Sequence, residues 1–452
     1  MKREIIRKIA AALLAFALAS KFLLAGAGAS FGVSQESPVF SGAALSQPAR
    51  DFVLTGKFLT KDRGSANLYF HTDSNLSKGY AVAINNDATG KHWWRASGSL
   101  ASTRNVAKHF ARDGEWFELK IKVHGAEIST WIDGLKVVEY IEPQKPFRTK
   151  ENQNMKLGSG TFALKHLGGG SVLVKDLKIE PLPPRNDISN QRTNAIDEET
   201  DGVIRLHQRD FPVLNFHVHL KGGFTADWAF AKSRKFGINY AIAPNCGRDF
   251  ELNRAEKAAD YLDFEAKDYP FIICMQAEGR EWHKLFGRDI RGRFAYVFTD
   301  AMTFDDLSGK RTHIWRSNEV NCPAGEEQKY MDLIVDTICN ILENEPADVY
   351  ANPMRLPEIL EKDFGKYWTP ERRRRVLDSL AKSGKALEIN LLTRLPDFDF
   401  IKSAKARGVK FTFGSNNAAP EFGKFEYACE AIEKCGLSPD DIFNPHSAKI
   451  SK

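Results

Sequence analysis

Cysteine is scarce in this chain of 452 residues, and positive charge exceeds negative charge only slightly. The six cysteines include no CxxC pair, which excludes a zinc ribbon. A net charge of +6, from 64 Lys and Arg against 58 Asp and Glu, is small for this length. The basic residues are spread out apart from Arg372–Arg375, which argues against a nucleic acid partner. Hydrophobic residues make up 42% of the chain, which excludes a wholly disordered protein.

Long hydrophobic runs are also rare, and the one that could meet a membrane lies at the N-terminus. Basic residues in the segment 2–8 precede the apolar run Ile9–Ser20, and the small residues Ala25–Ala29 follow. This order predicts a signal peptide at 1–29 and an exported protein, periplasmic or secreted, without stable membrane association after cleavage. The alternative is a single membrane anchor, but Lys21 leaves fewer than the roughly 18 apolar residues that a spanning helix needs.

Export would permit disulfide bonds, and the cysteines leave two alternatives open. All six lie in the second half of the chain, at positions 246, 274, 322, 339, 429 and 435. Cys429 and Cys435 flank one predicted helix end and could pair. Buried free thiols are the other alternative, and spacing alone does not decide between them.

Short strands and turns fill the first half of the chain. Phe117, Leu119, Ile121 and Val123 alternate with charged residues, as in a half-buried antiparallel strand. Asp133-Gly134 is a strong hairpin signal. Nine strands without an amphipathic helix predict a β-sandwich over 45–184. The predicted strands are Asp51–Thr60, Ala66–Thr72, Gly79–Asn86, Ser97–Thr103, Glu115–Gly125, Glu127–Asp133, Leu135–Tyr140, Gly160–Leu167 and Ser171–Leu182.

Residues 185–209 are polar and follow Pro183-Pro184, which indicates a linker. From 210 to 452, seven strands alternate with helices, which predicts a βα barrel. No glycine-rich phosphate loop follows any strand, and this weakens a nucleotide-binding interpretation. The strands are Val213–Leu220, Asn239–Asn245, Phe271–Gly279, Tyr296–Met302, Asp348–Pro353, Ala386–Leu391 and Lys410–Asn417. The helices include Thr225–Phe236, Gln328–Glu345, Thr369–Ser383, Asp397–Arg407 and Phe422–Lys434.

Polar residues mark the carboxyl ends of these strands, where barrels of this type carry their sites. His217 and His219 are two apart on a strand, so both point to one face. With Glu278 they predict a site for one divalent metal ion, with Zn, Mn and Ca as candidates. Satisfied buried histidines and a salt-bridged glutamate are the alternative. Asp300 or Glu388 could add a carboxylate.

Asn215-Phe-His-Val-His219 and Met275-Gln-Ala-Glu278 resemble motifs of the polymerase-and-histidinol-phosphatase (PHP) superfamily of metal-dependent hydrolases. Asp348–Pro353 and Phe413–Asn417 extend the resemblance, which covers about 210–446. It implies a seven-stranded βα barrel, with His217 and His219 as a ligand pair and Glu278 as a bridging carboxylate.

The sequence departs from the PHP pattern at three positions where the family has acidic or imidazole ligands. Asn352, Asn416 and Asn417 stand there, and asparagine is a neutral, weak ligand. One metal ion, or a metal-free sugar pocket to which these asparagines contribute, therefore fits better than a trinuclear cluster. Arg280 and Trp282 follow Glu278 and suit a sugar or an anion, with ordinary packing as the alternative.

A second resemblance rests on motifs of the first half, taken as a set. They resemble the 3-keto-disaccharide hydrolase domain, a concanavalin-like jelly roll of exported bacterial proteins, over about 45–182. The motifs are Asn67-Leu-Tyr-Phe-His71, Lys78-Gly-Tyr80, Ile84-Asn-Asn-Asp87, Ser97-Gly-Ser-Leu100, Arg104-Asn105, Gly114-Glu-Trp116, Ile132-Asp-Gly134 and Phe162-Ala-Leu-Lys-His166.

Strand alternation suggests which of these residues bind a sugar. Leu68 and Phe70 share one face, so Asn67, Tyr69 and His71 share the other. Candidates for the same cleft are Asn85, Arg104, Trp116 and His166, although His166 is also in phase with core residues.

The second resemblance implies that a ketone at C3 of the sugar acidifies the C2 proton. A base removes this proton, the C1 substituent leaves, and water adds. His71 and His166 are candidate bases, while Arg104 or Lys165 could stabilise the oxyanion. The carboxylate pair of ordinary glycosidases is not evident.

The sequence thus predicts an exported carbohydrate-active hydrolase with two domains, a jelly-roll sandwich followed by a (βα)7 PHP-like or TIM-like barrel. The expected partner is a glycan or an oxidised glycoside, cleaved by the sandwich. Two alternatives remain open. The barrel could be the metal-dependent hydrolase, with the sandwich as a glycan-binding module, or the protein could bind carbohydrate without catalysis.

Overall fold

The computed structural model describes residues 31–33, 37–38, 43–44, 49–423 and 425–448. The predicted signal peptide at 1–29 lies outside them. The chain divides into two compact units, residues 1–210 and 211–452, and each is considered by itself. Within the described ranges no helix combines the length and the apolarity that a membrane crossing requires.

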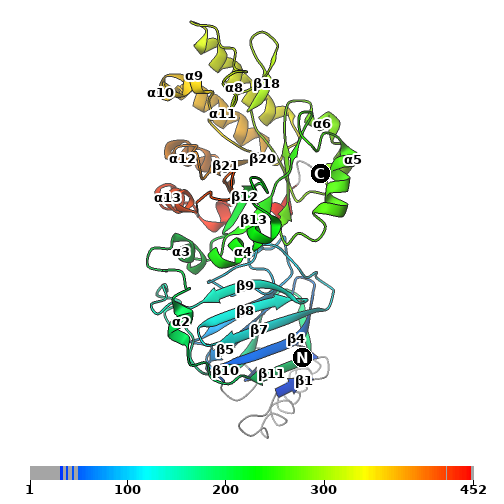
Figure 1. Cartoon of the computed structure of the whole chain (residues 1–452), viewed down its shortest axis with the longest axis vertical. Helices are drawn as coiled ribbons and strands as arrows, with labels where there is room; N and C mark the ends of the chain where they lie inside the picture. The colour runs from blue at the N-terminus through cyan, green and yellow to red at the C-terminus, as the bar shows by residue number, and fades with distance from the viewer. Residues whose placement is uncertain (1–30, 34–36, 39–42, 45–48, 424, 449–452) are drawn as a thin grey trace, which may run out of the picture. The chain divides into compact units, whose positions relative to one another are not determined.

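The first unit is a jelly-roll-like sandwich of two antiparallel sheets (Figure 1). One sheet has the order β1-β11-β4-β7-β8-β9, with β2 also on β11, and the other has the order β3-β10-β5-β6. The strands of the larger sheet are β1 (Phe31–Val33), β2 (Ser37–Pro38), β4 (Phe52–Lys61), β7 (Phe117–His124), β8 (Glu127–Ile132), β9 (Leu135–Ile141) and β11 (Ser171–Pro181). Those of the four-stranded sheet are β3 (Ala43–Ala44), β5 (Ser65–Thr72), β6 (Tyr80–Asn85) and β10 (Thr161–Gly168).

Alternation along the strands builds the core between the two sheets. Phe117, Leu119, Ile121 and Val123 of β7 are buried in one cluster, which also holds Leu68 and Phe70 of β5. Glu118, between two of the buried residues of β7, is exposed. The hairpin between β8 and β9 turns at Asp133 and Gly134, whose φ angles of 47° and 84° suit a type I′ turn.

Residues 97–103 were predicted to form a strand, but they do not form one in the structure. Gly98 and Ser102 have φ angles of 90° and 59°, so this stretch turns instead of extending. Backbone hydrogen bonds still attach it to β6, with Ala83 donating to Ser99 and Ala101 donating to Ala81. The other eight predicted strands are present.

The predicted linker 185–209 differs as well, because it carries helices α2 (Ile188–Arg192) and α3 (Gly202–Gln208). Its polar side chains are not all solvated. Gln191 accepts a hydrogen bond from the backbone N–H of Ala126, and Glu198 is buried beside Arg148. The polar residues of this segment suggested a linker, but some of them instead bond to buried groups of the sandwich.

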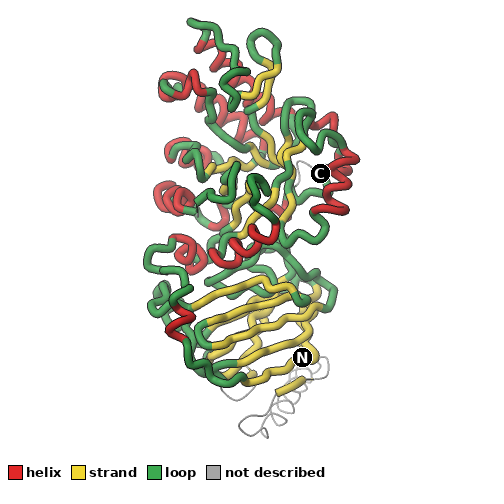
Figure 2. Tube along the Cα trace, in the orientation of Figure 1, coloured by secondary structure: helices red, strands yellow, loops and turns green. Residues whose placement is uncertain are grey.

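The second unit contains a curled parallel sheet of nine strands with helices around it (Figure 2). Its order is β14-β16-β17-β20-β21-β22-β12-β13-β15. The seven predicted strands are all present, two of them split: β12 (Leu214–Val218), β13 (Asn239–Ile242) with β14 (Asn245–Cys246), β15 (Ile272–Ile273) with β16 (Met275–Ala277), β17 (Val297–Thr299), β20 (Val349–Tyr350), β21 (Ala386–Asn390) and β22 (Phe411–Gly414).

Helices follow the strands in the second unit. The longer ones are α4 (Ala226–Phe236), α8 (Glu327–Asn344), α11 (Pro370–Ser383), α12 (Phe398–Ala406) and α13 (Glu426–Cys435). Shorter elements are α5 (Ala255–Asp260), η1 (Tyr261–Glu265), α6 (Trp282–Leu285), α7 (Arg288–Arg291), the hairpin β18 (Thr303–Asp305) and β19 (Arg311–His313), α9 (Glu358–Glu361), α10 (Phe364–Tyr367), η2 (Pro439–Asp441) and η3 (Pro445–Ser447).

Capping explains where the predicted helices begin and end. The Thr369 side chain accepts a hydrogen bond from Arg372 N–H at the start of α11, and Gly384 ends the helix in the left-handed region. The last helix begins at Glu426 and not at Phe422. All six cysteines are free thiols, and Cys246, Cys274 and Cys435 are buried, so Cys429 and Cys435 do not pair.

Candidate functional site

A pocket with a volume of about 120 Å³ lies on the four-stranded sheet of the first unit. We call it the sandwich pocket. Strands β5 and β6 supply its floor, and the turn after β6 supplies one wall. It is lined by Arg63, Ser65, Ala66, Asn67, Ala83, Asn85, Asp87, Gly90, Lys91, His92, Arg95 and Leu167. Asn67 and Asn85, both predicted to bind substrate, are among them.

Asn67 carries the pocket's unpaired buried acceptor. It pairs with Ala83 across β5 and β6, and the small alanine leaves room beside it. Its side-chain nitrogen donates to the Tyr69 hydroxyl at 3.4 Å, while its Oδ1 is buried without a hydrogen-bond partner among the described residues. An unpaired amide oxygen in a pocket is suited to accept a hydrogen bond from a sugar hydroxyl.

Asn85 shapes the wall of the pocket. Its side-chain nitrogen donates to the carbonyl oxygens of His92 at 3.3 Å and Arg95 at 3.1 Å. Its Oδ1 accepts from the N–H of Asp87 at 3.1 Å. Asn85 therefore holds the turn that presents His92 and Arg95 to the pocket, which is a positioning role.

Asp210, which directly follows the predicted linker 185–209, contacts this turn. Its Oδ2 lies 3.4 Å from Nε2 of His92, and its Oδ1 accepts from Trp94 Nε1 at 3.3 Å and from the Arg95 guanidinium. Sequence reasoning missed His92, Arg95 and Asp210. The available signal was Lys91-His-Trp-Trp-Arg95, a basic and aromatic run directly after the Asn85 motif.

His71 does not lie in the pocket, although alternation placed it beside Asn67. Its φ of 54° breaks the alternation of β5, and its ring packs against the rings of Phe52 and Phe70. Nε2 donates to the Arg50 carbonyl at 2.7 Å, and Nδ1 accepts from Gly158 N–H. Burial lowers the pKa of His71 to about 4, so it is a neutral core residue. This environment does not suit the predicted role of a base.

His166 and Lys165 are on β10, beside the pocket. The His166 ring bonds to the Gly170 carbonyl at 3.0 Å, which ties a local turn. Lys165 is exposed and pairs with Asn67 across β5 and β10. Neither residue lines the sandwich pocket.

Two further predicted residues serve the packing of the sandwich. The Arg104 guanidinium is buried, donates to the Thr103 carbonyl and lies 5.1 Å from the centre of the Tyr140 ring. Trp116 stacks under Lys175 of β11, in the other sheet. Neither lines the pocket, because one sits in the core and the other on the larger sheet.

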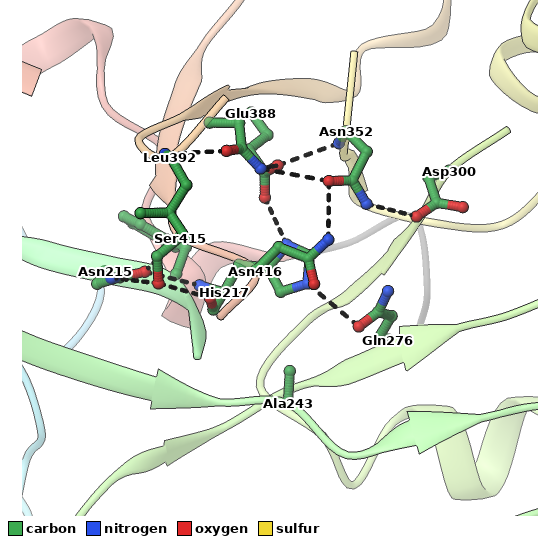
Figure 3. A network of polar contacts seen from close by, with 12 residues as sticks. Asn215, His217, Ala243, Gln276, Asp300, Asn352, Glu388, Leu392, Ser415 and Asn416 are labelled. Atoms are coloured by element: carbon green, nitrogen blue, oxygen red, sulfur yellow. Dashed lines mark hydrogen bonds and ion pairs between the residues drawn. The ribbon is translucent and has the colours of Figure 1, made fainter. Parts of the chain in front are cut away.

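A buried polar network joins the carboxyl ends of the strands in the second unit (Figure 3). His217 lies with its Nδ1 2.6 Å from Glu388 Oε2 and its Nε2 3.1 Å from Gln276 Oε1. Burial acts to raise the pKa of Glu388, but the adjacent His217 and hydrogen bonds hold it below the usual value. Gln276 lies within the motif Met275–Glu278, but sequence reasoning predicted no role for it.

The asparagines extend this network. Asn352 donates to Asp300 Oδ2 at 2.7 Å, and its Oδ1 accepts from Asn390 and Asn416. The backbone N–H of Asn352 donates to Glu388 Oε1 at 3.0 Å. Asn417 instead bonds to the backbone of His219, on both its oxygen and its nitrogen. Asn352 and Asn416 thus converge, while Asn417 fixes strand β12, and sugar binding by these asparagines stays a prediction.

The predicted metal ligands His219 and Glu278 have hydrogen-bond partners of their own. His219 places Nδ1 2.6 Å from the Ala243 carbonyl and Nε2 3.2 Å from Asn416 Oδ1. Glu278 accepts from Asn245 at 2.8 Å, and its Oε2 has no partner among the described residues. Burial, and then the charge of Asp300, raise the pKa of Glu278 to about 8.

No group of three or more His, Cys, Asp or Glu side chains that could hold a metal ion is found in the described part of the chain. Two imidazoles are adjacent, with ring centres 5.0 Å apart, but Glu278 does not complete their set. The side chains as they lie therefore do not fit a three-ligand centre, and the metal ion stays a prediction.

Arg280 and Trp282 are structural in the second unit. Arg280 forms an ion pair with Glu345 at 2.8 Å and donates to the carbonyls of Asp300 and Thr303. Trp282 is fully buried and donates to the same glutamate at 2.5 Å. Their donors are committed to the fold, so the sugar-binding role predicted for them is not favoured.

Comparison with known families finds one match, over residues 29–180, to the 3-keto-alpha-glucoside-1,2-lyase-like domain. None of the curated proteins matches the chain. The match ends before the second unit, so the PHP resemblance rests on the sequence motifs alone.

Three similar solved structures each cover about a third of the chain. A protein provisionally named a glycosyl hydrolase, from Parabacteroides distasonis, is 15% identical, covers 33% of this chain and 81% of its own, and has a TM-score of 0.29. The carbohydrate-binding module CBM66 from Bacillus subtilis is 14% identical over 33% of this chain and 96% of its own, with a TM-score of 0.23. The galectin LEC-6 of Caenorhabditis elegans is 13% identical over 35% and 99%, with a TM-score of 0.19. Over residues 29–180, the first unit of this chain is thus similar to the 3-keto-alpha-glucoside-1,2-lyase-like domain.

Proposed function

We propose that the first unit binds and cleaves glycosides whose sugar is oxidised to a ketone at C3, and that it does so in the sandwich pocket. The observation that carries this proposal is the unpaired, buried Oδ1 of Asn67 in a pocket of the matched domain. In this role Asn67 accepts a hydrogen bond from a hydroxyl of the sugar. Residues 1–29 would export the enzyme, whose expected location is the periplasm or the exterior.

The reaction follows from the acidity of the substrate. A C3 ketone acidifies the proton on C2, and removal of that proton leaves an enolate on C2, C3 and the ketone oxygen. The enolate expels the C1 substituent, which takes up a proton and leaves as an alcohol. Water then adds across C1 and C2, so the sum is hydrolysis of the glycoside. The chain must supply a base for the C2 proton and a positive group for the enolate.

The experiment is to incubate the full mature chain with a 3-keto-glucoside and with the same glucoside not oxidised at C3. We expect release of 3-keto-glucose from the first and no release from the second. Asn67→Ala should raise KM, because the unpaired acceptor is lost, and Thr193→Ala, on the exposed end of α2, serves as the matched control. Binding of the oxidised glycoside without release of 3-keto-glucose would show that the protein binds carbohydrate without cleaving it. Equal cleavage of both glucosides would overturn the proposal.

The second candidate function is hydrolysis in the second unit, which we propose to be a seven-stranded barrel of the PHP type. Its support is the buried network around His217, Glu388 and Asn352. On this proposal the sandwich binds the glycan and the barrel acts on it, with a divalent ion as the predicted cofactor. Activity that a chelator abolishes, and that Glu278→Gln removes, would favour this candidate.

A further inference from the structure

The turn between β4 and β5 brings an arginine to the edge of the sandwich pocket. Gly64 N–H donates to the Lys61 carbonyl at 3.0 Å. Between them, Asp62 and Arg63 have φ angles of 54° and 62°, the geometry of a type I′ hairpin turn, whose second central position strongly favours glycine. A long side chain is uncommon in the left-handed region, yet Arg63 occupies it and lines the pocket. Such an outlier suggests a function for the side chain.

A lysine from the turn after β6 also lines the pocket. Lys91 and Arg63 are both exposed, and within the described ranges neither forms an ion pair with a carboxylate. Lys165 is the cross-strand partner of Asn67, so its exposed side chain adds positive charge on the same face of the sheet. The face of the sheet that carries Asn67 therefore has a positive rim.

The negative charge at the pocket is committed to other groups. Asp87 is the acidic residue of the lining, and its Oδ1 accepts hydrogen bonds from the N–H and the hydroxyl of Thr89 at 3.1 and 3.0 Å. Asp210, behind the wall, forms an ion pair with Arg95 and so offsets the charge of that guanidinium. The charges of the two exposed cations on the lining are therefore in excess.

We propose that the sandwich pocket takes glycosides whose substituent at C1 carries a negatively charged group, and that Arg63 and Lys91 bind this group. The proposal rests on the function proposed above and names its substrate class. With the sugar held on the floor by Asn67, the exposed cations of the rim meet the part of the ligand that extends beyond the sugar. A carboxylate and a phosphate ester share the required chemistry, because both accept paired hydrogen bonds from a guanidinium.

The test compares two 3-keto-glucosides as substrates of the full mature chain. One carries 4-hydroxybenzoate at C1 and the other 4-hydroxybenzamide, so a carboxylate is exchanged for a neutral amide of similar shape. We expect KM to be about 5-fold lower for the carboxylate, as for two exposed charge pairs. The difference should shrink at high ionic strength, because salt screens exposed charges. The 3-keto-glucoside of 4-hydroxyphenyl phosphate shows whether a phosphate ester is preferred to a carboxylate.

Arg63→Gly and Lys91→Gln, combined in a double variant, should bring the two KM values together. Arg63→Gly removes the charge and places glycine where the turn favours it, so it should not lower the unfolding temperature. Loss of the preference therefore reports on the charge and not on the fold. Lys178→Gln, on β11 of the larger sheet, removes an exposed positive charge elsewhere and should keep the wild-type ratio of the KM values.

The outcomes separate this inference from the proposed function. If the wild-type chain cleaves both glucosides with equal KM, or if the double variant keeps the preference, the substrate class is wrong while cleavage of 3-keto-glucosides stands. If neither glucoside is cleaved, the proposed function falls, and isothermal titration with each glucoside tests the anion site by itself. Tighter binding of the carboxylate, lost in the double variant, would support that site, and equal binding of the two glucosides would overturn it.

Discussion

Arg148 and Glu198 form an ion pair in the first unit, 3.0 Å between Nη1 and Oε2, with side chains only 5% and 1% exposed. Arg148 also donates to the hydroxyls of Tyr80 and Tyr140, and Tyr140 donates to Glu198. The pair therefore joins the predicted linker to the core of the sandwich. The residues that follow, up to Asp210, are held in the same unit.

We expect Glu198→Ala to destabilise the first unit by about 3–5 kcal/mol, because Arg148 would remain buried without its partner. Glu199→Ala is the matched control, since the neighbouring side chain is exposed and should have little effect. Denaturant unfolding of the mature chain measures both. Equal stability of the two variants would show that the segment is a linker after all.

The stability of the first unit should fall on acidification between pH 6.5 and 4. His71 has a pKa of about 4 in the folded chain, below the ordinary value of 6.5, so the unfolded state binds a proton first. The stability that neutral His71 contributes is present above pH 6.5 and is lost as the pH falls toward 4. The loss is on the order of 3 kcal/mol at pH 4.

Thermal unfolding at pH 7 and pH 4.5 measures this dependence, with His71→Gln as the variant that cannot titrate. His71→Gln should be less stable at pH 7 and should lose less stability on acidification than the wild type. His109 is buried with a similarly lowered pKa of about 4, so part of the dependence will remain. An unchanged pH dependence in His71→Gln would contradict the assignment of His71 to the core.

Gly414 leaves the space that the polar network of the second unit needs. A Cβ at this position would lie 2.3 Å from Glu388 Oε2 and 2.8 Å from the Cβ of His217. Gly414→Ala should therefore separate His217 from Glu388 and cost about 1–3 kcal/mol of stability. Gly365→Ala, where a Cβ meets nothing within 4 Å, is the control. If both variants unfold at the same denaturant concentration, the packing beside Glu388 has room for a Cβ at position 414, which would contradict this prediction.

Much of the fold could be predicted because the strands of the sandwich are half-buried, while those of the second unit are short and buried. The alternation in β7 and the Asp133-Gly134 turn specify the sandwich, and polar residues after apolar strands specify the ends of the parallel sheet. Residues 97–103 could not be predicted in this way, since Gly98 and Ser102 adopt left-handed conformations within an otherwise strand-like pattern.

The site was predicted only in part, because strand alternation shows on which face of the sheet a side chain lies but not which residues it contacts. Asn67 was assigned correctly to the outer face of β5, while the φ of 54° turns His71 into the core. Asp210 and His92 are far apart in sequence, and no periodicity connects them. Arg280 and Trp282 follow Glu278 in sequence, but Glu345 of the segment after α8 binds both.

The metal prediction can be tested without any substrate. Under the second candidate function, one divalent ion per mature chain should remain after dialysis against metal-free buffer, and His219→Ala should lose it, because His219 is one of the two adjacent imidazoles. His283→Ala, on α6, is the control that should keep it. Elemental analysis of the purified proteins measures this. A metal-free wild-type chain that does not take up Zn²⁺ or Mn²⁺ would contradict the predicted centre.

The most direct test of the central claim is the effect of deuterium at C2 of a 3-keto-glucoside on its cleavage by the full mature chain. In an elimination the C2 proton is removed before the C1–O bond breaks. In a competition between labelled and unlabelled substrate, the deuterated glucoside should therefore be consumed more slowly. Equal consumption of the two, with 3-keto-glucose still released, would contradict cleavage by elimination.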